Sequence, residues 1–292
     1  MMAIDNIYAG WIGRNEVRRE RVDAHRAQAL AATLDVLFDF VDGAPLPPGW
    51  QWLYFNPIAA RSTLAEDGHP RRELAGSFLP PVPLPRRMWA GSRVRYLREL
   101  PIGVDATRES HVVKIVEKDG RGGKLCFVTV EHRISAGSDE CIVEEQDIVY
   151  REASARLQFA SVGLEPAPDA PVEFSDRITP DSTLLFRYSA LTFNGHRIHY
   201  DKPYARDFEG YRNLVVHGPL TATLLQNFAR ACKPECALTR FDFKGVNPLF
   251  VEETFELQAW SDANDSNLLN MRALDARGVL AMQASAYCKP IY

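Results

Sequence analysis

Apolar residues recur at helical intervals between residues 15 and 41. They would share one face of a helix: Leu30, Leu34, Leu37, Phe38 and Val41. We therefore predict a helix over this stretch. Proline then interrupts the pattern in "GAPLPPGW" and throughout residues 66–89, which are too proline-rich for a helix or a central strand. We predict long ordered loops there, with a role as a lid or tunnel wall around a ligand.

Alternation of apolar and polar residues replaces the helical spacing from residue 94 to residue 151. The segments "SHVVKIVEK", "LCFVTVEHRI" and "CIVEEQDIVYRE" are separated by the turns "DGRGGK" and "SAGSDE". This pattern predicts a three-stranded antiparallel meander. The glycines of the first turn resemble a phosphate loop, but no helix follows them. We therefore interpret that segment as a hairpin turn between two strands.

The pattern starts again in the second half of the chain. The segment "GLEPAPDAPVEFSDRITPD" is rich in proline and has little periodicity, which is typical of an interdomain linker. A helical stripe then begins just after Gly218, with Pro219 in its first turn; its members are Leu220, Leu224, Leu225 and Phe228. Two further alternating blocks follow. We predict an α+β protein with a first domain at 1–163, a linker at 164–181 and a second domain at 182–292.

Composition and charge narrow the class of protein. Of the 292 residues, 46% are hydrophobic and 25% are charged, which is enough for a sizeable core. The net charge of -4 gives no basic field for nucleic acid, and no apolar run approaches the ~18 residues that span a bilayer. The amino terminus lacks the apolar stretch of a signal peptide, and the five cysteines are scattered. We therefore expect a cytoplasmic protein with reduced thiols.

The densest group of polar side chains lies in "FNGHRIHYD", residues 193–201. A metal site, a proton-transfer site and a polar loop are the three interpretations. A catalytic zinc normally needs three protein ligands, and His196 and His199 have no third ligand at a recognisable spacing, so we expect no metal. A histidine can act as acid or base near neutrality, and Asn194 can both donate and accept hydrogen bonds to hold a water. We therefore favour proton transfer.

A second candidate lies in "VVHGPL", residues 215–220, just before the predicted central helix. Free N–H groups at the start of a helix and the positive end of its dipole favour a developing oxyanion, so the Gly218 N–H is suited to stabilise one. Glycine also lets a ligand approach without a β-carbon in the way. The alternative is that Gly218 only begins a buried helix and that His217 caps a contact.

These two segments together carry a resemblance to a known family. "FNGHRIHYD" followed by "HGPL" and an apolar helix resembles the motif of the MaoC-like (R)-specific enoyl-thioester hydratases, Gly-Asp-x-Asn-Pro-(apolar)-His followed by His-Gly. In that family a sheet wraps a long helix in the hot-dog fold. With "GWIGR", "WQWLYFNP" and "RRMWAGSRVRYLREL", the whole chain resembles the double hot-dog subgroup of mesaconyl-C4-CoA hydratases, itaconyl-CoA hydratases and type 2 3-hydroxyacyl-thioester dehydratases.

The resemblance implies roles for individual residues. His199 corresponds to the motif histidine, and Gly218 to the glycine whose amide faces the thioester oxygen. The motif aspartate falls on Asn194, and an amide cannot accept a proton as a carboxylate does. The resemblance therefore implies that His199 is a lone base and that Asn194 holds the water. His196 and Arg197 take the places of the motif asparagine and proline and are expected to support or select the substrate.

Other residues have roles that the resemblance only suggests. Asp201 either orients the catalytic histidine or caps the turn that begins "KPYA". In the family, the first hot dog lacks a site of its own and lines the acyl pocket, which here would involve the loops from Trp89 to Arg95. Arg240 and Lys244 are candidates for the coenzyme phosphates, because they are the nearest basic residues after the central helix.

The expected activity is reversible hydration of an enoyl-CoA by a homodimer, with coenzyme A as part of the substrate and no metal or redox cofactor. If Arg197 turns inward, its charge would pair with a second carboxylate, as in mesaconyl-C4-CoA or itaconyl-CoA. The alternative is that Arg197 faces outward and pairs with Asp207 or Glu209. Two other functions stay open: a 3-hydroxyacyl-thioester dehydratase of fatty-acid type, and a non-catalytic acyl-thioester-binding protein.

Overall fold

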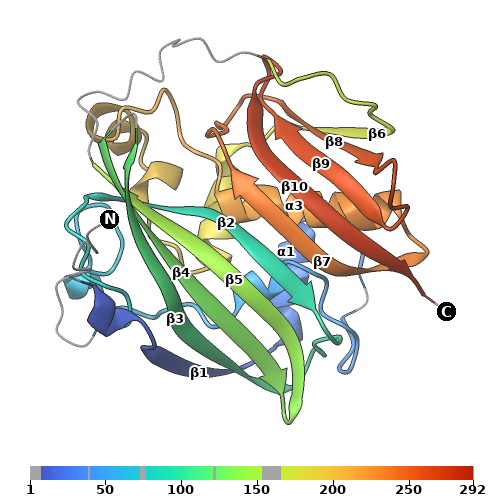
Figure 1. Cartoon of the computed structure of the whole chain (residues 1–292), viewed down its shortest axis with the longest axis horizontal. Coiled ribbons are helices and arrows are strands. Elements are labelled where there is room, and N and C mark those ends of the chain that lie inside the picture. Colours follow the sequence, from blue (N-terminus) through green and yellow to red (C-terminus); the bar gives the residue numbers. More distant parts are fainter. Residues whose placement is uncertain (1–7, 39, 73–76, 121–122, 153–165, 292) are drawn as a thin grey trace, which may run out of the picture.

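A computed structural model describes residues 8–38, 40–72, 77–120, 123–152 and 166–291. Within them, ten strands form one antiparallel sheet in the order β1-β3-β4-β5-β2-β7-β10-β9-β8-β6 (Figure 1). The strands are β1 Asn15–Arg21, β2 Arg86–Tyr96, β3 Asp105–Gly120, β4 Gly123–Ala136, β5 Asp139–Arg151, β6 Phe174–Ile178, β7 Cys236–Gly245, β8 Phe255–Ser261, β9 Leu268–Leu274 and β10 Leu280–Pro290. The helices are α1 Ala24–Leu34, α2 Ser182–Leu191 and α3 Gly218–Cys232, with short 3-10 or π turns at Ala9–Trp11, Trp50–Leu53, Arg61–Thr63, Arg197–His199 and Tyr204–Phe208.

Strands from the two halves of the sequence meet at the centre of the sheet. β1 to β5 form one side and β6 to β10 the other, and they join where β2 pairs with β7. A large antiparallel sheet with few helices confirms the α+β class. The domain division at 164–181 stays a prediction. Part of that segment lies outside the described residues, and Phe174–Ile178 forms β6, which pairs with β8.

The central helix α3 begins where the sequence predicts. Pro219 occupies its first turn, where the missing N–H leaves no helical bond unmade. Leu220 and Leu225 are fully buried, and α3 contacts β7, β8, β9 and β10. Figure 1 shows the helix lying behind these strands, so the second half of the sheet covers one of its faces.

The prediction of one helix over residues 15–41 is wrong at both ends. Its first part forms β1, an edge strand that pairs with β3 and alternates in exposure. α1 starts after Asp23, whose carboxylate accepts a 2.8 Å hydrogen bond from the Arg26 N–H. It ends before Asp35, whose backbone is left-handed with a φ of 52°. Leu37, which the helical spacing places on the apolar face, is fully exposed.

The three-stranded meander is confirmed, because β3 pairs with β4 and β4 with β5. The first ladder continues to Gly120 opposite Gly123. This pairing confirms the hairpin interpretation of "DGRGGK", although residues 121 and 122 lie outside the described ones.

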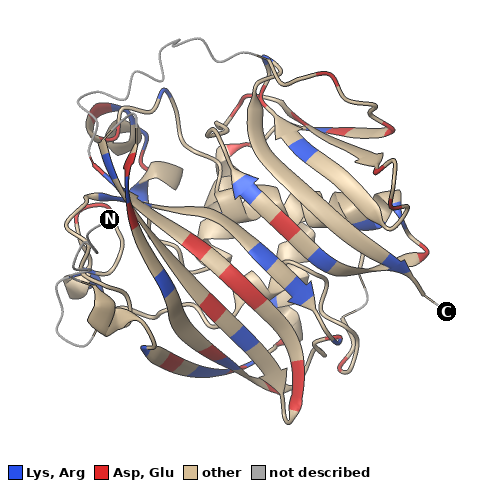
Figure 2. Ribbon diagram, in the orientation of Figure 1, with Lys and Arg blue, Asp and Glu red and all other residues tan. Residues whose placement is uncertain are grey.

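Charged residues of both signs are interspersed along β3, β4, β5, β2 and β7 (Figure 2). This distribution agrees with the small net charge of -4 and provides no continuous basic stripe on these strands. Of the helices that the structure describes, none is long and apolar enough to cross a membrane.

Candidate active site

A cavity of about 690 Å³ lies between the two halves of the chain. It brings together five of the residues that the sequence singles out: Trp89, Asn194, His196, His199 and Gly218. The first half contributes residues of β2, β4 and β5 together with loop residues 69–72 and 77–80. Part of the proline-rich stretch at 66–89 therefore forms cavity wall, as the sequence predicts. The prediction of a loop is wrong for residues 86–89, which belong to β2 and pair with β5.

His199 is held in the form that can accept a proton. It lies in the 3-10 turn Arg197–His199, and its Nδ1 is 2.7 Å from the Val215 carbonyl oxygen. A carbonyl only accepts hydrogen bonds, so Nδ1 carries the proton and Nε2 keeps its lone pair. Burial lowers the pKa of His199 to about 4, so the imidazole is neutral at pH 7. A neutral, fixed imidazole on a cavity wall is suited to act as a general base.

A second buried histidine, His217, stacks on His199. The two ring centroids are 3.6 Å apart and the planes differ by 19°. His217 Nε2 forms a 2.8 Å hydrogen bond with the Ser189 hydroxyl, and its side chain does not cap the helix. Burial and the neighbouring His199 lower the pKa of His217 well below its ordinary value. The sequence shows His217 directly before the central helix, but its stacking on the base depends on the fold.

Asn194 follows α2 in a strained turn. Phe193 has a left-handed backbone with a φ of 50°, a conformation that is strained for a residue with a β-carbon and is enriched at functional sites. The Asn194 Oδ1 accepts a 3.0 Å hydrogen bond from the His196 N–H. Among the described residues no acceptor binds the Asn194 Nδ2. That amide nitrogen therefore has hydrogens available for a water or a substrate oxygen in the cavity.

The Gly218 N–H fits an oxyanion-binding role. Gly218 is the first residue of α3, so its N–H has no partner within the helix. Gly218 also lines the cavity. A β-carbon placed on Gly218 would meet no atom within 4 Å. The cavity is therefore open beside the Gly218 Cα, and an oxygen that carries developing negative charge can approach the helix N-terminus without meeting a side chain.

A loop of the first half packs directly on the turn that carries Asn194, His196 and His199. The Asp67 carbonyl accepts a 2.9 Å hydrogen bond from the Arg197 N–H. A β-carbon on Gly68 would lie 1.9 Å from the Gly195 carbonyl oxygen, and the φ of Gly68 is +88°. Only glycine fits this position, because it tolerates both the conformation and the contact.

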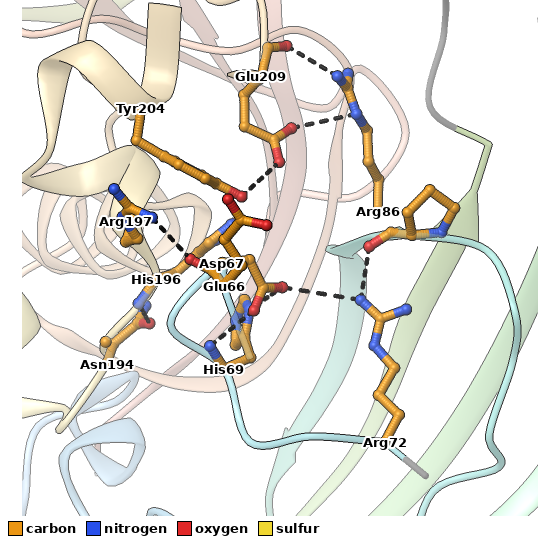
Figure 3. Close-up of polar contacts among 12 residues, drawn as sticks. Glu66, Asp67, His69, Arg72, Arg86, Asn194, His196, Arg197, Tyr204 and Glu209 are labelled. Carbon is orange, nitrogen blue, oxygen red and sulfur yellow. Dashed lines mark hydrogen bonds and ion pairs between the residues drawn. The ribbon is translucent and has the colours of Figure 1, made fainter. Parts of the chain in front are cut away.

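This contact adds a fourth histidine, His69, to His196, His199 and His217 (Figure 3). Its ring centroid is 4.2 Å from that of His196, which in turn lies 5.4 Å from that of His199. The Asp67 carboxylate accepts a 3.0 Å hydrogen bond from the His69 Nδ1. Burial lowers the pKa of both His69 and His196, so we expect neutral rings at pH 7. No pattern in the sequence indicates this contact between His69 and His196, because the two segments are distant in the chain.

Three of these side chains also have the arrangement of a candidate cation site. Asp67, His69 and His196 each place one nitrogen or oxygen atom within 4.8 Å of the others. However, the Asp67 Oδ2 is already bonded to the His69 Nδ1, and the Arg72 guanidinium lies 3.9 Å from the same oxygen. The positive charge of Arg72 opposes a further cation there. We therefore interpret the group as a hydrogen-bonded wall, and the expected absence of a metal stays a prediction.

Arg197 does not face the cavity. Its guanidinium pairs with Asp201 through Nη2 at 2.7 Å and Nε at 3.0 Å, and it lies 4.1 Å from the centroid of the Tyr204 ring. The outward alternative is the correct one, although the partner is Asp201 and neither Asp207 nor Glu209. The Asp201 Oδ1 also accepts the Tyr204 N–H at 3.1 Å, which confirms its capping role over an orienting one.

Neither candidate for the coenzyme phosphates lines this cavity. Lys244 is exposed on β7, and Arg240 pairs with Asp242 at 2.6 Å. Trp89 does form part of the wall. Its indole N–H donates to the Ser92 hydroxyl at 2.9 Å, and its ring packs edge-on against Trp52 at 5.1 Å.

The wall formed by the first half carries buried polar side chains among its apolar ones. The Glu144 carboxylate accepts hydrogen bonds from the Ser92 hydroxyl at 2.7 Å and from the Trp52 indole at 2.9 Å. Burial raises the pKa of Glu144 and lowers the pKa of Arg108 to about 10. The buried Arg108 Nε has no hydrogen-bond partner. Two buried ionisable groups therefore face the part of the cavity where the acyl group is expected.

Comparisons with known proteins agree with this geometry. The model of the family "Hydroxyacyl-thioester dehydratase type 2" matches residues 49–251. The chain is 44% identical over 282 residues to mesaconyl-C(4)-CoA hydratase of Chloroflexus aurantiacus, covering 95% of this chain and 96% of that protein. It is 28% identical to the mitochondrial hydroxyacyl-thioester dehydratase type 2 of Schizosaccharomyces pombe, covering 73% and 77%.

A solved structure supports the fold. A Mycobacterium tuberculosis protein with a double hotdog fold superposes with a TM-score of 0.56 at 14% identity, covering 95% of this chain and 96% of that one. This similarity, together with the sheet wrapped over α3, confirms the expected double hot-dog fold.

Proposed function

The chain belongs to the type 2 hydroxyacyl-thioester dehydratase family and is a hydro-lyase, and from this premise we propose that it reversibly hydrates a short dicarboxylic enoyl-CoA such as mesaconyl-C4-CoA. The substrate assignment is supported by the 44% identity to a mesaconyl-C(4)-CoA hydratase over nearly the whole chain. The observation that carries the reaction is the neutral His199 beside the open Gly218 N–H on one cavity wall.

The geometry suggests how these residues add water. The His199 Nε2 takes a proton from a water molecule while the water oxygen bonds to the β-carbon of the enoyl group. The Gly218 N–H stabilises the negative charge that develops on the thioester oxygen. The imidazolium then gives its proton to the α-carbon, so that one water is added in total. The free Asn194 amide hydrogens hold the water oxygen on the side of the β-carbon that faces the base.

The buried Glu144 and Arg108 on this wall favour an acyl group that carries polar atoms over a long alkyl chain. An alkyl tail packed against Arg108 would leave its buried Nε, which has no hydrogen-bond partner in the protein, without one. The dehydratase of fatty-acid type is thus the second candidate, supported by the lower identity to the S. pombe protein. The non-catalytic alternative has less support, since the base and the oxyanion-binding amide are both in place.

An activity screen tests this function. The purified chain is mixed with mesaconyl-C4-CoA, itaconyl-CoA, crotonyl-CoA or a long-chain 2-enoyl-CoA, and loss of the enoyl-thioester absorbance is followed. We expect the highest kcat/KM with a dicarboxylic ester and a product heavier by one water. Preference for the long-chain ester would support the fatty-acid type, and binding without turnover of any ester would support the non-catalytic class.

We further propose a cytoplasmic homodimer that needs no metal or redox cofactor. The free thiols of all the described cysteines are compatible with a reducing compartment. Light scattering coupled to gel filtration tests the dimer, and a monomeric mass would contradict it. Full activity after dialysis against a chelator tests the absence of a required metal.

A further inference from the structure

Arg87 projects from β2 into the cavity beside the histidines. Successive side chains of a strand point to opposite faces. The neighbouring Arg86 turns the other way and pairs with Glu209 at 3.2 Å, as Figure 3 shows. Arg87 and Trp89 share the cavity face, and Arg87 lies opposite Tyr150 of β5 in the ladder.

The guanidinium of Arg87 hydrogen-bonds with the Tyr150 hydroxyl but has no carboxylate partner among the described residues. Two other cavity arginines are already occupied: Arg18 pairs with Glu16 at 2.7 Å, and Arg72 donates to the carbonyls of Leu84 and Pro85. A partly buried guanidinium without a counter-charge loses hydration and gains little in return. An anion bound in the cavity would supply the missing negative charge.

Arg87 lies near His196, whose ring contacts that of His199, the proposed base, and this position indicates which anion it would bind. Its charge contributes to the lowered pKa of both His69 and His196, after the larger effect of burial. The His196 ring in turn contacts the ring of His199. In a mesaconyl-C4 thioester the free carboxylate is attached to the β-carbon, which is the carbon that receives the water. A residue that binds this carboxylate must therefore lie close to the catalytic base.

The charges of the remaining cavity arginines influence groups other than His196. Arg108 is influenced chiefly by burial and by Arg18, Glu16 and Glu144, at the wall formed by the first half. Arg151 is influenced by burial and then by Tyr211. Neither charge contributes to the pKa of His196, whereas that of Arg87 does. Arg197 is already paired outside the cavity.

We propose that Arg87 binds the β-carboxylate of the substrate and thereby selects dicarboxylic enoyl-CoA esters. This role rests on the proposed function, because it presumes a second carboxylate. A planar guanidinium can hold both carboxylate oxygens at once. Such a pair fixes the orientation of the alkene, so one face of the β-carbon is presented to the His199 Nε2 and the hydroxyl adds with a single configuration.

The test compares Arg87→Met with Arg95→Met, a matched control on the same strand whose side chain is exposed and outside the cavity. For Arg87→Met we expect kcat/KM for mesaconyl-C4-CoA to fall by about 30- to 1,000-fold, the scale for removing one partner of a buried charge pair. Turnover of crotonyl-CoA, which has no second carboxylate, should change by less than about threefold, since the catalytic residues remain. Arg95→Met should leave both substrates unchanged.

The outcomes separate this role from the function itself. If the parent protein hydrates mesaconyl-C4-CoA but Arg87→Met loses equal activity on both esters, the carboxylate-binding role is overturned and the function stands. If the parent protein hydrates only esters without a second carboxylate, the proposed function on dicarboxylic esters is itself contradicted, whatever the Arg87 variant does. If circular dichroism shows that Arg87→Met does not fold, Arg87→Lys replaces it in the test. Lysine keeps the charge but loses the bidentate contact. A loss of activity confined to the dicarboxylic ester would then support the role, and an equal loss on both esters would contradict it.

Discussion

Replacement of His199 by alanine removes the proposed base, and its consequences follow from the contacts of the ring. The imidazole is 7% exposed, bonds to the Val215 carbonyl at 2.7 Å and stacks on His217. Loss of a general base typically lowers kcat by about 10²- to 10⁴-fold, and we expect at least ~10²-fold here. The carbonyl left without a donor should reduce the free energy of unfolding by about 1 to 3 kcal/mol, which leaves the fold intact.

The pH dependence gives a second measure of the same residue. The neutral imidazole is the active form, so with a pKa of about 4 the hydration rate should be flat near pH 7 and fall only toward acid. The folded pKa lies below the ordinary 6.5. The unfolded chain therefore binds the proton more tightly, and stability that is fully present above pH 6.5 is lost as the pH falls toward 4. This contribution is about 3 kcal/mol at most.

Initial rates of hydration across pH, with urea unfolding of the same samples, test both consequences. His25→Ala is the control, because His25 is exposed on α1 and lies outside the cavity. His199→Ala should lose the acid limb of the rate profile and part of the acid-induced loss of stability, whereas His25→Ala should match the parent. Turnover within a few-fold of the parent in His199→Ala would refute the assignment of His199 as the base.

Three further changes probe the rest of the site. Asn194→Asp keeps the oxygen that accepts the backbone N–H and should retain activity with a shifted pH profile, while Asn194→Ala should be severely impaired; equal loss in both would indicate a purely structural amide. Gly68→Ala should lower kcat and stability far more than Gly43→Ala. Both glycines have a φ of +88°, but only the β-carbon added at position 68 would clash with the Gly195 carbonyl. Equal unfolding midpoints and rates in the two variants would contradict the close contact. Arg197→Met should affect dicarboxylic and simple enoyl esters alike, because its partner is Asp201; a loss confined to the dicarboxylic ester would instead place Arg197 at the substrate.

Local patterns were sufficient for much of the framework. The meander from β3 to β5 and the start of α3 follow from alternation, helical spacing and the Pro219 position, all of which involve residues close in sequence. The polar turn of Asn194 and His199 was also visible as a cluster. The same reasoning failed between residues 15 and 41, because Leu37 continues the spacing of Leu30 and Leu34 beyond the end of α1.

The completed site depended on contacts between distant parts of the chain. Arg197 donates to the carbonyl of Glu66, 131 positions away, and the loop next to it brings His69 against His196. The direction of the Arg197 side chain was likewise set by its packing against Asp201 and Tyr204. No short-range spacing encodes such pairs, because they form only when β2 and β7 join the two halves of the sheet and fix the loops above them.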